Sequence, residues 1–119
     1  MNITKIHLQN VKSYADETLS FKEGINIIGG ANGAGKTTII EAIGYGLFGR
    51  KPDYTFSEFV RRGAKDGGIE IWFEVDCVSY KIERTFTSKQ SGDWNVYYTE
   101  SGRRVDLHGD GDIKRLLEI

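Results

Sequence analysis

The hydrophobic pattern changes its period along the chain, and its first half predicts strands followed by one helix. Polar and apolar residues alternate over 2–11 and again over 17–22, which is typical of half-buried strands. Residues 25–28 form a short apolar run, as in a strand that is buried on both faces. Over 36–48 the apolar residues recur at helical spacing and predict a helix with a broad apolar face. Gly44 and Gly46 are poor helix formers, so we expect them where this helix packs closely on a sheet.

The second half predicts mainly strands. A short helix capped by Ser57 is expected over 57–62, and strand candidates follow at 68–76, 78–87, 93–100 and 103–107. Two dipeptides have the composition of hairpin turns between these strands, Asp76-Cys77 and Ser91-Gly92. A last helix is expected from residue 113. Together the elements predict an α/β or α+β fold, in which a strand, a loop and a helix join an antiparallel set of strands.

Composition changes this picture little. The chain has 119 residues, is 39% hydrophobic and 28% charged, and carries a net charge of -1, so no bulk charge draws it to nucleic acid or a membrane. No apolar run approaches the roughly 20 residues of a membrane span. The single cysteine, Cys77, excludes an internal disulfide, fits a reducing cytosol, and is expected to be a buried or half-buried apolar residue.

One glycine-rich segment carries specific chemistry. Residues 30–37, with the sequence GANGAGKT, follow the pattern of Gly, four residues, then Gly-Lys-Thr. This pattern lies between a predicted buried strand and a predicted apolar helix, which is the setting that a phosphate-binding loop needs. Three glycines let the backbone turn sharply and approach phosphate oxygens closely: Gly30, Gly33 and Gly35. Their N–H groups and the start of the helix present partial positive charge to an anion.

The residues at the end of this loop have separate expected roles. The ammonium of Lys36 is expected between the β- and γ-phosphates of ATP, as the binding and catalytic lysine. The hydroxyl of Thr37 is expected to coordinate Mg²⁺, and Thr38 to contact the α-phosphate. The alternative, a glycine-rich turn with an accidental lysine, is much less favoured because the motif and its setting agree.

Hydrolysis needs more than this loop. A second strand that ends in Asp-Glu has to supply a metal ligand and orient the attacking water. The candidate is 69–76, but it alternates polar and apolar residues, so one face is expected to be wet and we reject Asp76 as that ligand. The Leu-Ser-Gly-Gly signature that would close a partner's nucleotide site is not found in the sequence. The chain is therefore expected to bind a nucleotide with only part of a hydrolytic site.

Two segments resemble a known family. The opening ITKIHLQNVKSYADETLSFKEGINIIGGANGAGKTTIIEAIGYGLFG is similar to the N-terminal lobe of the chromosome-maintenance ATPases, and most similar to the DNA double-strand-break repair ATPases of the Rad50/SbcC family. The later segment FVRRGAKDGGIEIWFEVDCVSYKIERTF strengthens that branch. The resemblance implies an ABC-type P-loop NTPase fold. Residues 1–119 would be a single partial domain, with the C-terminal lobe and coiled coil elsewhere.

The resemblance also implies site residues and partners. Asn32, Gly33, Ala34, Gly35, Lys36, Thr37 and Thr38 would hold the phosphates and Mg²⁺. Lys12 takes the place of a phosphate-contacting basic residue that is usually Arg in the family, and Arg62, Gly63 and Ala64 would lie along the ribose and base. Implied partners are the C-terminal lobe, a second head, an Mre-type nuclease and DNA, in the cytoplasm or at the nucleoid.

Several alternatives stay open at this point. The chain could be a lobe of another chromosome-maintenance or recombination ATPase, a nucleotide-dependent binding module that never hydrolyses, or a fragment without separate biology. Lys12 could be a solvated lysine at a strand end, and Arg61, Arg62 and Lys65 an exposed charged turn. Arg103-Arg104 is more simply a surface pair than a contact to DNA phosphate. His7 and His108 show no metal spacing, and the remaining aromatic residues favour hairpin packing over base stacking: Trp72, Phe73, Trp94 and Tyr97.

Overall fold

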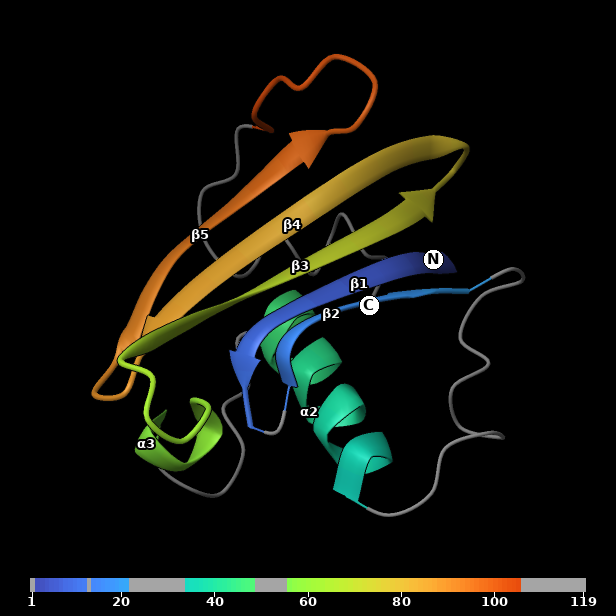
Figure 1. Ribbon diagram of the computed structural model, residues 1–119. Coiled ribbons are helices and arrows are strands. Elements are labelled where there is room, and N and C mark those ends of the chain that lie inside the picture. The colour runs from blue at the N-terminus through green and yellow to red at the C-terminus, as the bar shows by residue number, and fades with distance from the viewer. Residues whose placement is uncertain (1, 13, 22–33, 49–55, 106–119) are drawn as a thin grey trace.

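A computed structural model describes residues 2–12, 14–21, 34–48 and 56–105 (Figure 1). Within these residues, five strands form one antiparallel sheet in the order β2-β1-β3-β4-β5. The strands are β1 (Asn2–Val11), β2 (Tyr14–Ser20), β3 (Asp66–Val75), β4 (Val78–Thr87) and β5 (Ser91–Tyr98). The helices are α2 (Ala34–Phe48) and α3 (Phe56–Phe59). These elements confirm the predicted fold class, with boundaries shifted by up to three residues. The predicted strand at 25–28 and helix from 113 lie outside the described residues.

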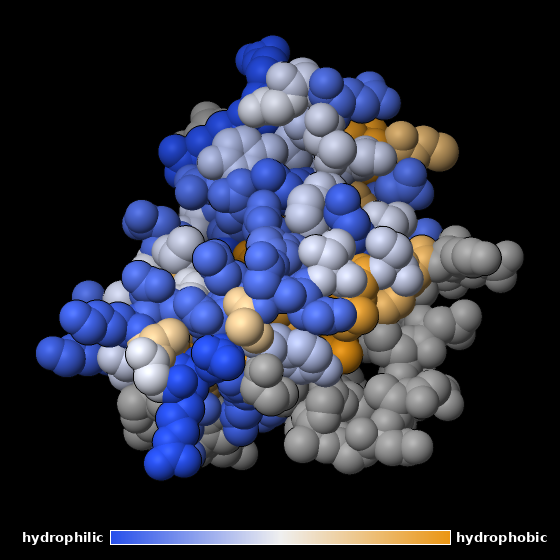
Figure 2. Space-filling model, in the orientation of Figure 1, coloured by the Kyte–Doolittle hydropathy of each residue, from blue (hydrophilic) through white to orange (hydrophobic). Residues whose placement is uncertain are grey.

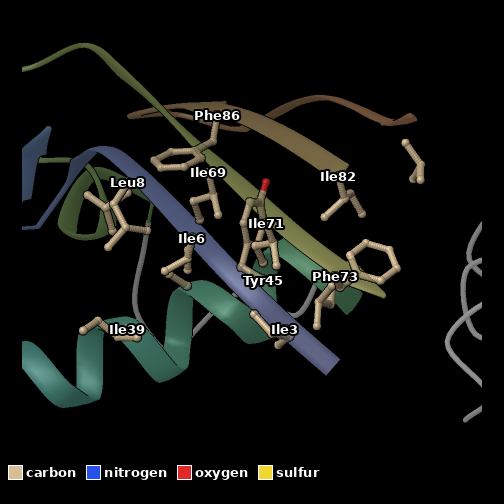
Figure 3. Packing of buried hydrophobic residues seen from close by; sticks show 14 of the residues in the cluster. Ile3, Ile6, Leu8, Ile39, Tyr45, Ile69, Ile71, Phe73, Ile82 and Phe86 are labelled. Atoms are coloured by element: carbon tan, nitrogen blue, oxygen red, sulfur yellow. The ribbon is translucent and has the colours of Figure 1, made fainter. Parts of the chain in front are cut away.

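The sheet has two different faces because its strands alternate apolar and polar residues. On β3, Ile69, Ile71 and Phe73 are buried beneath α2, while Glu70 and Trp72 face the other side. Figure 3 shows the buried side chains of the sheet meeting those of α2. Hydrophilic residues dominate the molecular face shown in Figure 2, where hydrophobic ones surface only in small groups. The expectation that 68–76 has one wet face is therefore confirmed.

Helix α2 packs closely on the sheet at Gly46. A Cβ on Gly46 would lie 2.5 Å from Cδ1 of Ile71, so a larger residue would require the Ile71 side chain or the helix to shift. The expected close packing is confirmed at Gly46 and is wrong for Gly44, where a Cβ would meet nothing within 4 Å. None of the described helices has the length and hydropathy to cross a membrane.

The hairpin between β3 and β4 turns at Asp76 and Cys77, as the sequence predicts. Both residues have positive φ, 49° and 66°, which suits the primed turns that match strand twist. Cys77 is exposed, so the expectation of a buried or half-buried residue is wrong. A side chain at the tip of a two-residue turn lies beyond the last cross-strand pair, Val75 with Val78, and has no core to enter.

The predicted turn at Ser91-Gly92 is wrong, because both residues belong to β5. The chain reverses just before β5, at Ser88 to Gln90. There the backbone N–H of Thr87 donates to the carbonyl of Gln90 at 2.8 Å, and the Thr87 hydroxyl accepts from Lys89 and Gln90 N–H groups. Gly92 serves close packing instead, since a Cβ there would lie 2.5 Å from the hydroxyl of Thr85.

Two further elements are shorter than predicted. Helix α3 ends at Phe59 because Val60 pairs with Val11 as an isolated bridge, and Ser57 lies inside the helix and so is not its cap. In place of the strand expected over 103–107, Arg104 forms a single bridge to Tyr97. Residues 106 and 107 lie outside the described part.

Candidate nucleotide-binding site

The start of α2 carries the residues with the most specific predicted chemistry. Ala34, Gly35, Lys36, Thr37 and Thr38 occupy its first turns, whereas Gly30, Asn32 and Gly33 lie outside the described residues. A helix of this length, 15 residues, presents unsatisfied N–H groups and partial positive charge at its N-terminus. Its first turn contains no acidic residue, so no carboxylate of the helix competes there with a bound anion.

Lys12 is held by backbone contacts at the end of β1. Its N–H donates to the carbonyl of Phe59 at 2.9 Å, and the N–H of Arg61 donates to the carbonyl of Asn10 at 2.8 Å. Lys12 and Asn10 adopt positive φ values of 51° and 55°, uncommon for residues other than glycine. These hydrogen bonds tie β1 to the chain segment after α3. The structure thus brings Lys12 to the segment that contains Arg62, Gly63 and Ala64.

That segment turns tightly at a glycine. Gly63 has a φ of 91°, and a Cβ there would meet nothing within 4 Å, so conformation and not space requires glycine. The N–H of Ala64 donates to the carbonyl of Arg61 at 2.9 Å and closes the turn. Arg61 and Arg62 are exposed on it. The turn therefore presents backbone and two cations beside the end of β1.

Three aromatic residues join this region to α2. The Tyr45 ring of α2 packs edge-on against Phe59 of α3 and Phe86 of β4, with centroid distances of 5.8 and 5.7 Å, and the two phenyl rings are 5.0 Å apart. All three side chains are buried. Burial raises the pKa of Tyr45 above its usual value, although the nearby charge of Arg84 opposes the rise. The cluster links the helix that starts at the loop with the segment that holds Lys12.

Arg84 is a buried residue that no sequence motif indicates. It lies on the same face of β4 as the core residues Tyr80, Ile82 and Phe86. Its own exposed fraction is 8%. Its Nε donates to the carbonyl of Gly46 at 2.8 Å. The signal was present in the sequence, because alternation over 78–87 places position 84 on the apolar side of the strand.

The opposite face of the sheet carries an ion-pair network. His7 lies between Glu70 at 2.7 Å and Asp16 at 2.6 Å, and Lys81 bridges Glu70 and Glu83 at 3.3 and 2.9 Å. Partial burial alone would lower the pKa of His7, but its two carboxylate partners outweigh burial and raise it above the ordinary value. The sequence missed these contacts because they cross strands. No group of three His, Cys, Asp or Glu in the described ranges is arranged to hold a metal.

The aromatic residues divide between the two faces. Phe73 is buried and stacks on Tyr80 at 5.4 Å, as hairpin packing predicts. Trp72 lies on the outer face with the ammonium of Lys5 4.1 Å from its ring. A hollow of about 370 Å³ beside it is lined by Trp72, Lys81, Glu83, Tyr97, Tyr98, Thr99 and Gly102. Its one cation and one carboxylate, Lys81 and Glu83, are paired with each other at 2.9 Å.

Removing the Lys12 side chain is expected to weaken ATP binding by about 1 kcal/mol, roughly fivefold, which is the scale of one charge-assisted hydrogen bond. Lys12→Ala leaves the positive-φ backbone requirement unchanged, so it isolates the ammonium. Lys12→Arg is the matched control and should keep the affinity, because it restores a cation with a fork of donors. Titration with ATP and Mg²⁺ measures both variants. Equal affinity of Lys12→Ala and the unaltered chain would identify Lys12 as a solvated lysine.

Comparisons with known proteins place these features in context. The protein family described as AAA domain matches residues 5–117. DNA double-strand break repair Rad50 ATPases are similar in sequence. The one from Sulfolobus acidocaldarius is 42% identical over 86 residues, covering 71% of this chain and 10% of that protein. The one from Methanopyrus kandleri is 36% identical over 117 residues, covering 88% and 13%. The chain thus spans only 10% and 13% of these relatives' lengths.

Solved structures give the same fold. The recombination mediator protein RecF with ATPrS superposes with a TM-score of 0.68 and 25% identity, covering 93% of this chain and 29% of that one. The SMC head domain from Thermotoga maritima has a TM-score of 0.57 and 21% identity, covering 89% and 39%. At that identity the second likeness concerns the fold alone. Both neighbours share the arrangement of sheet and helix described above.

Proposed function

Since the chain belongs to the AAA domain family and is an N-terminal, ABC-type ATPase lobe of the Rad50/SbcC group, we propose that it binds ATP together with Mg²⁺. The observation that carries the proposal is the sequence at 30–37, whose last residues form the N-terminus of α2. A lysine and a threonine at the start of a long helix, behind a glycine-rich run, supply the donors that a triphosphate and its metal need.

The described residues suit an anionic ligand. The first turn of α2 offers N–H groups without an acidic side chain, and the helix is fixed to the sheet along its buried face. In the proposed arrangement the loop, from Gly30 to Gly35, wraps the β-phosphate. Lys36 neutralises the β- and γ-phosphates, Thr37 ligates Mg²⁺ and Thr38 reaches the α-phosphate.

The ribose and base are assigned to the turn after α3. Gly63 and Ala64 present backbone without bulky side chains, and Arg62 adds an exposed cation. Lys12 is tethered to Phe59 at the edge of the same region. In the proposed arrangement its ammonium would contact a phosphate. The geometry that supports this assignment is the joining of β1 to 59–64 by two backbone hydrogen bonds.

We further propose that the lobe works in the repair of DNA double-strand breaks. It would pair with a C-terminal lobe carrying the signature and the Asp-Glu strand, dimerise with a second head across two ATP molecules, and act with an Mre-type nuclease on DNA, in the cytoplasm or at the nucleoid. The names of the relatives support this reading. The likeness to RecF, a recombination mediator studied with ATP, makes a recombination ATPase the second candidate. The higher identity to the repair ATPases, 42% against 25%, favours the first.

Thr37→Val tests the metal part of the proposal. The substitution keeps the shape of the side chain and removes the hydroxyl, so the gain in ATP affinity that Mg²⁺ confers should largely disappear, while affinity without Mg²⁺ should change less than about twofold. Titrations with ATP, one in Mg²⁺ and one in a chelator, measure the affinity with and without the metal. Thr18→Val, on exposed β2, is the matched control and should bind as the unaltered chain. If both conditions lose affinity equally, Thr37 does not ligate the metal.

A further inference from the structure

Arg84 is a buried cation whose role the nucleotide site does not explain. A guanidinium remains charged at all accessible pH values, and burying a charge is unfavourable unless it is well paired. At 8% exposure, on the core face of β4, Arg84 stands where the neighbouring pattern of Ile82 and Phe86 would suit an apolar residue. Its contacts therefore indicate what the charge is for.

The Arg84 guanidinium contacts the C-terminal end of α2. Its Nε donates to the carbonyl of Gly46 at 2.8 Å. The last carbonyls of a helix lack partners within the helix and carry partial negative charge, so a cation is stabilising there. The last turn of α2 contains no basic residue. Arg84 supplies that cation from the sheet, and its guanidinium carbon lies over the rings of Tyr45 and Trp94, at 5.6 and 5.3 Å.

This contact lies where Gly46 packs closely on the sheet. Gly46 approaches Ile71 so closely that a Cβ would clash, and Tyr45 packs against both Phe59 and Phe86. The carbonyl of Phe59 in turn accepts the hydrogen bond from Lys12. The same few residues thus join α2, α3, β4 and the end of β1.

We propose that Arg84 is a positioning residue for nucleotide binding, which fixes the C-terminal end of α2 on the sheet and so sets where Lys36 stands relative to Lys12. The inference rests on the proposed function. Lys36 is about 15 Å along the helix from Gly46, so a tilt of about 10° at Gly46 displaces it by roughly 2–3 Å. Hydrogen bonds to phosphate oxygens tolerate a few tenths of an ångström, so such a tilt would break them.

The test compares Arg84→Met, Arg84→Lys and Ile82→Val with the unaltered protein. Two readouts are measured well below each melting temperature: amide hydrogen exchange of α2 without nucleotide, and affinity for ATP with Mg²⁺. Arg84→Met is expected to speed α2 exchange and to weaken ATP binding about tenfold, because only a minor fraction of molecules keeps the competent helix position. Arg84→Lys retains the charge without the planar fork. Its α2 exchange rate and its ATP affinity should lie between those of Arg84→Met and of the unaltered protein.

Ile82→Val is the control for a merely structural effect. Ile82 is buried on the same face of β4, so its truncation lowers the melting temperature while leaving the Gly46 contact in place, and ATP affinity should not change. Unaltered α2 exchange or ATP affinity in folded Arg84→Met overturns the inference, and so does an equal loss of affinity in Ile82→Val. If Arg84→Met does not fold, Arg84→Lys decides by the same criteria. A parallel Lys36→Ala titration tests the proposed function separately, since the exchange readout needs no nucleotide.

Discussion

Purified on its own, this chain is expected to bind ATP but to hydrolyse it at least about a thousandfold more slowly than a complete pair of heads, the scale set by losing a charge-stabilising group opposite the loop. The reason is an inventory of parts. Hydrolysis needs a metal-binding Asp, a group that orients water and a group that neutralises charge across from the phosphates. Asp76 lies in the exposed β3–β4 turn. It is therefore not at the end of a buried strand, where the metal-binding Asp is needed.

Phosphate release measures this prediction. Adding the C-terminal lobe in trans should restore turnover, and the restored rate should rise more steeply than linearly with protein concentration because two heads must meet. Lys36→Ala serves as the control, since a trace contaminant would be insensitive to it. Robust hydrolysis by the chain alone that depends on Lys36 and is independent of concentration would show that a complete active site lies within these residues.

Lys36→Ala is expected to reduce ATP affinity by about 100-fold, or roughly 3 kcal/mol, the upper range for hydrogen bonds to a charged group. The motif places no second cation between the β- and γ-phosphates, and Lys12 stands at the edge of the site. The effect should therefore exceed that of Lys12→Ala by more than tenfold. Lys89→Ala, in the exposed turn before β5, is the matched control for losing one positive charge. Calorimetric titration with ATP and Mg²⁺ measures all three variants, and near-normal binding by Lys36→Ala would refute the loop assignment.

The sequence was sufficient for the elements whose patterns are local. Alternation over 68–76 and 78–87 predicts β3 and β4 to within two residues, and helical spacing over 36–48 predicts α2. The turn at Asp76-Cys77 is likewise local, because two short residues between alternating runs favour a tight hairpin. Family resemblance added the site residues just after β1 and after α3, which no local pattern would have joined.

The sequence predictions that failed concern features that depend on contacts between distant segments. Gly92 looked like a turn residue, but its role is close packing on Thr85 across the hairpin, which shifts the turn to Ser88–Gln90. The end of α3 depends on pairing between Val60 and Val11. Arg84 was not singled out in the sequence, since its partner Gly46 is 38 residues away. Such contacts become visible only when the sheet order and the position of α2 are known.

The most direct test of the central claim is a calorimetric titration of the unaltered chain with ATP in the presence of Mg²⁺, compared with AMP. Because the proposed site is built around the β- and γ-phosphates, ATP should bind at one site per chain and at least about 100-fold more tightly than AMP, which lacks both groups that Lys36 neutralises. Absence of saturable ATP binding, or equal affinity for ATP and AMP, would contradict the assignment of a triphosphate site to the start of α2.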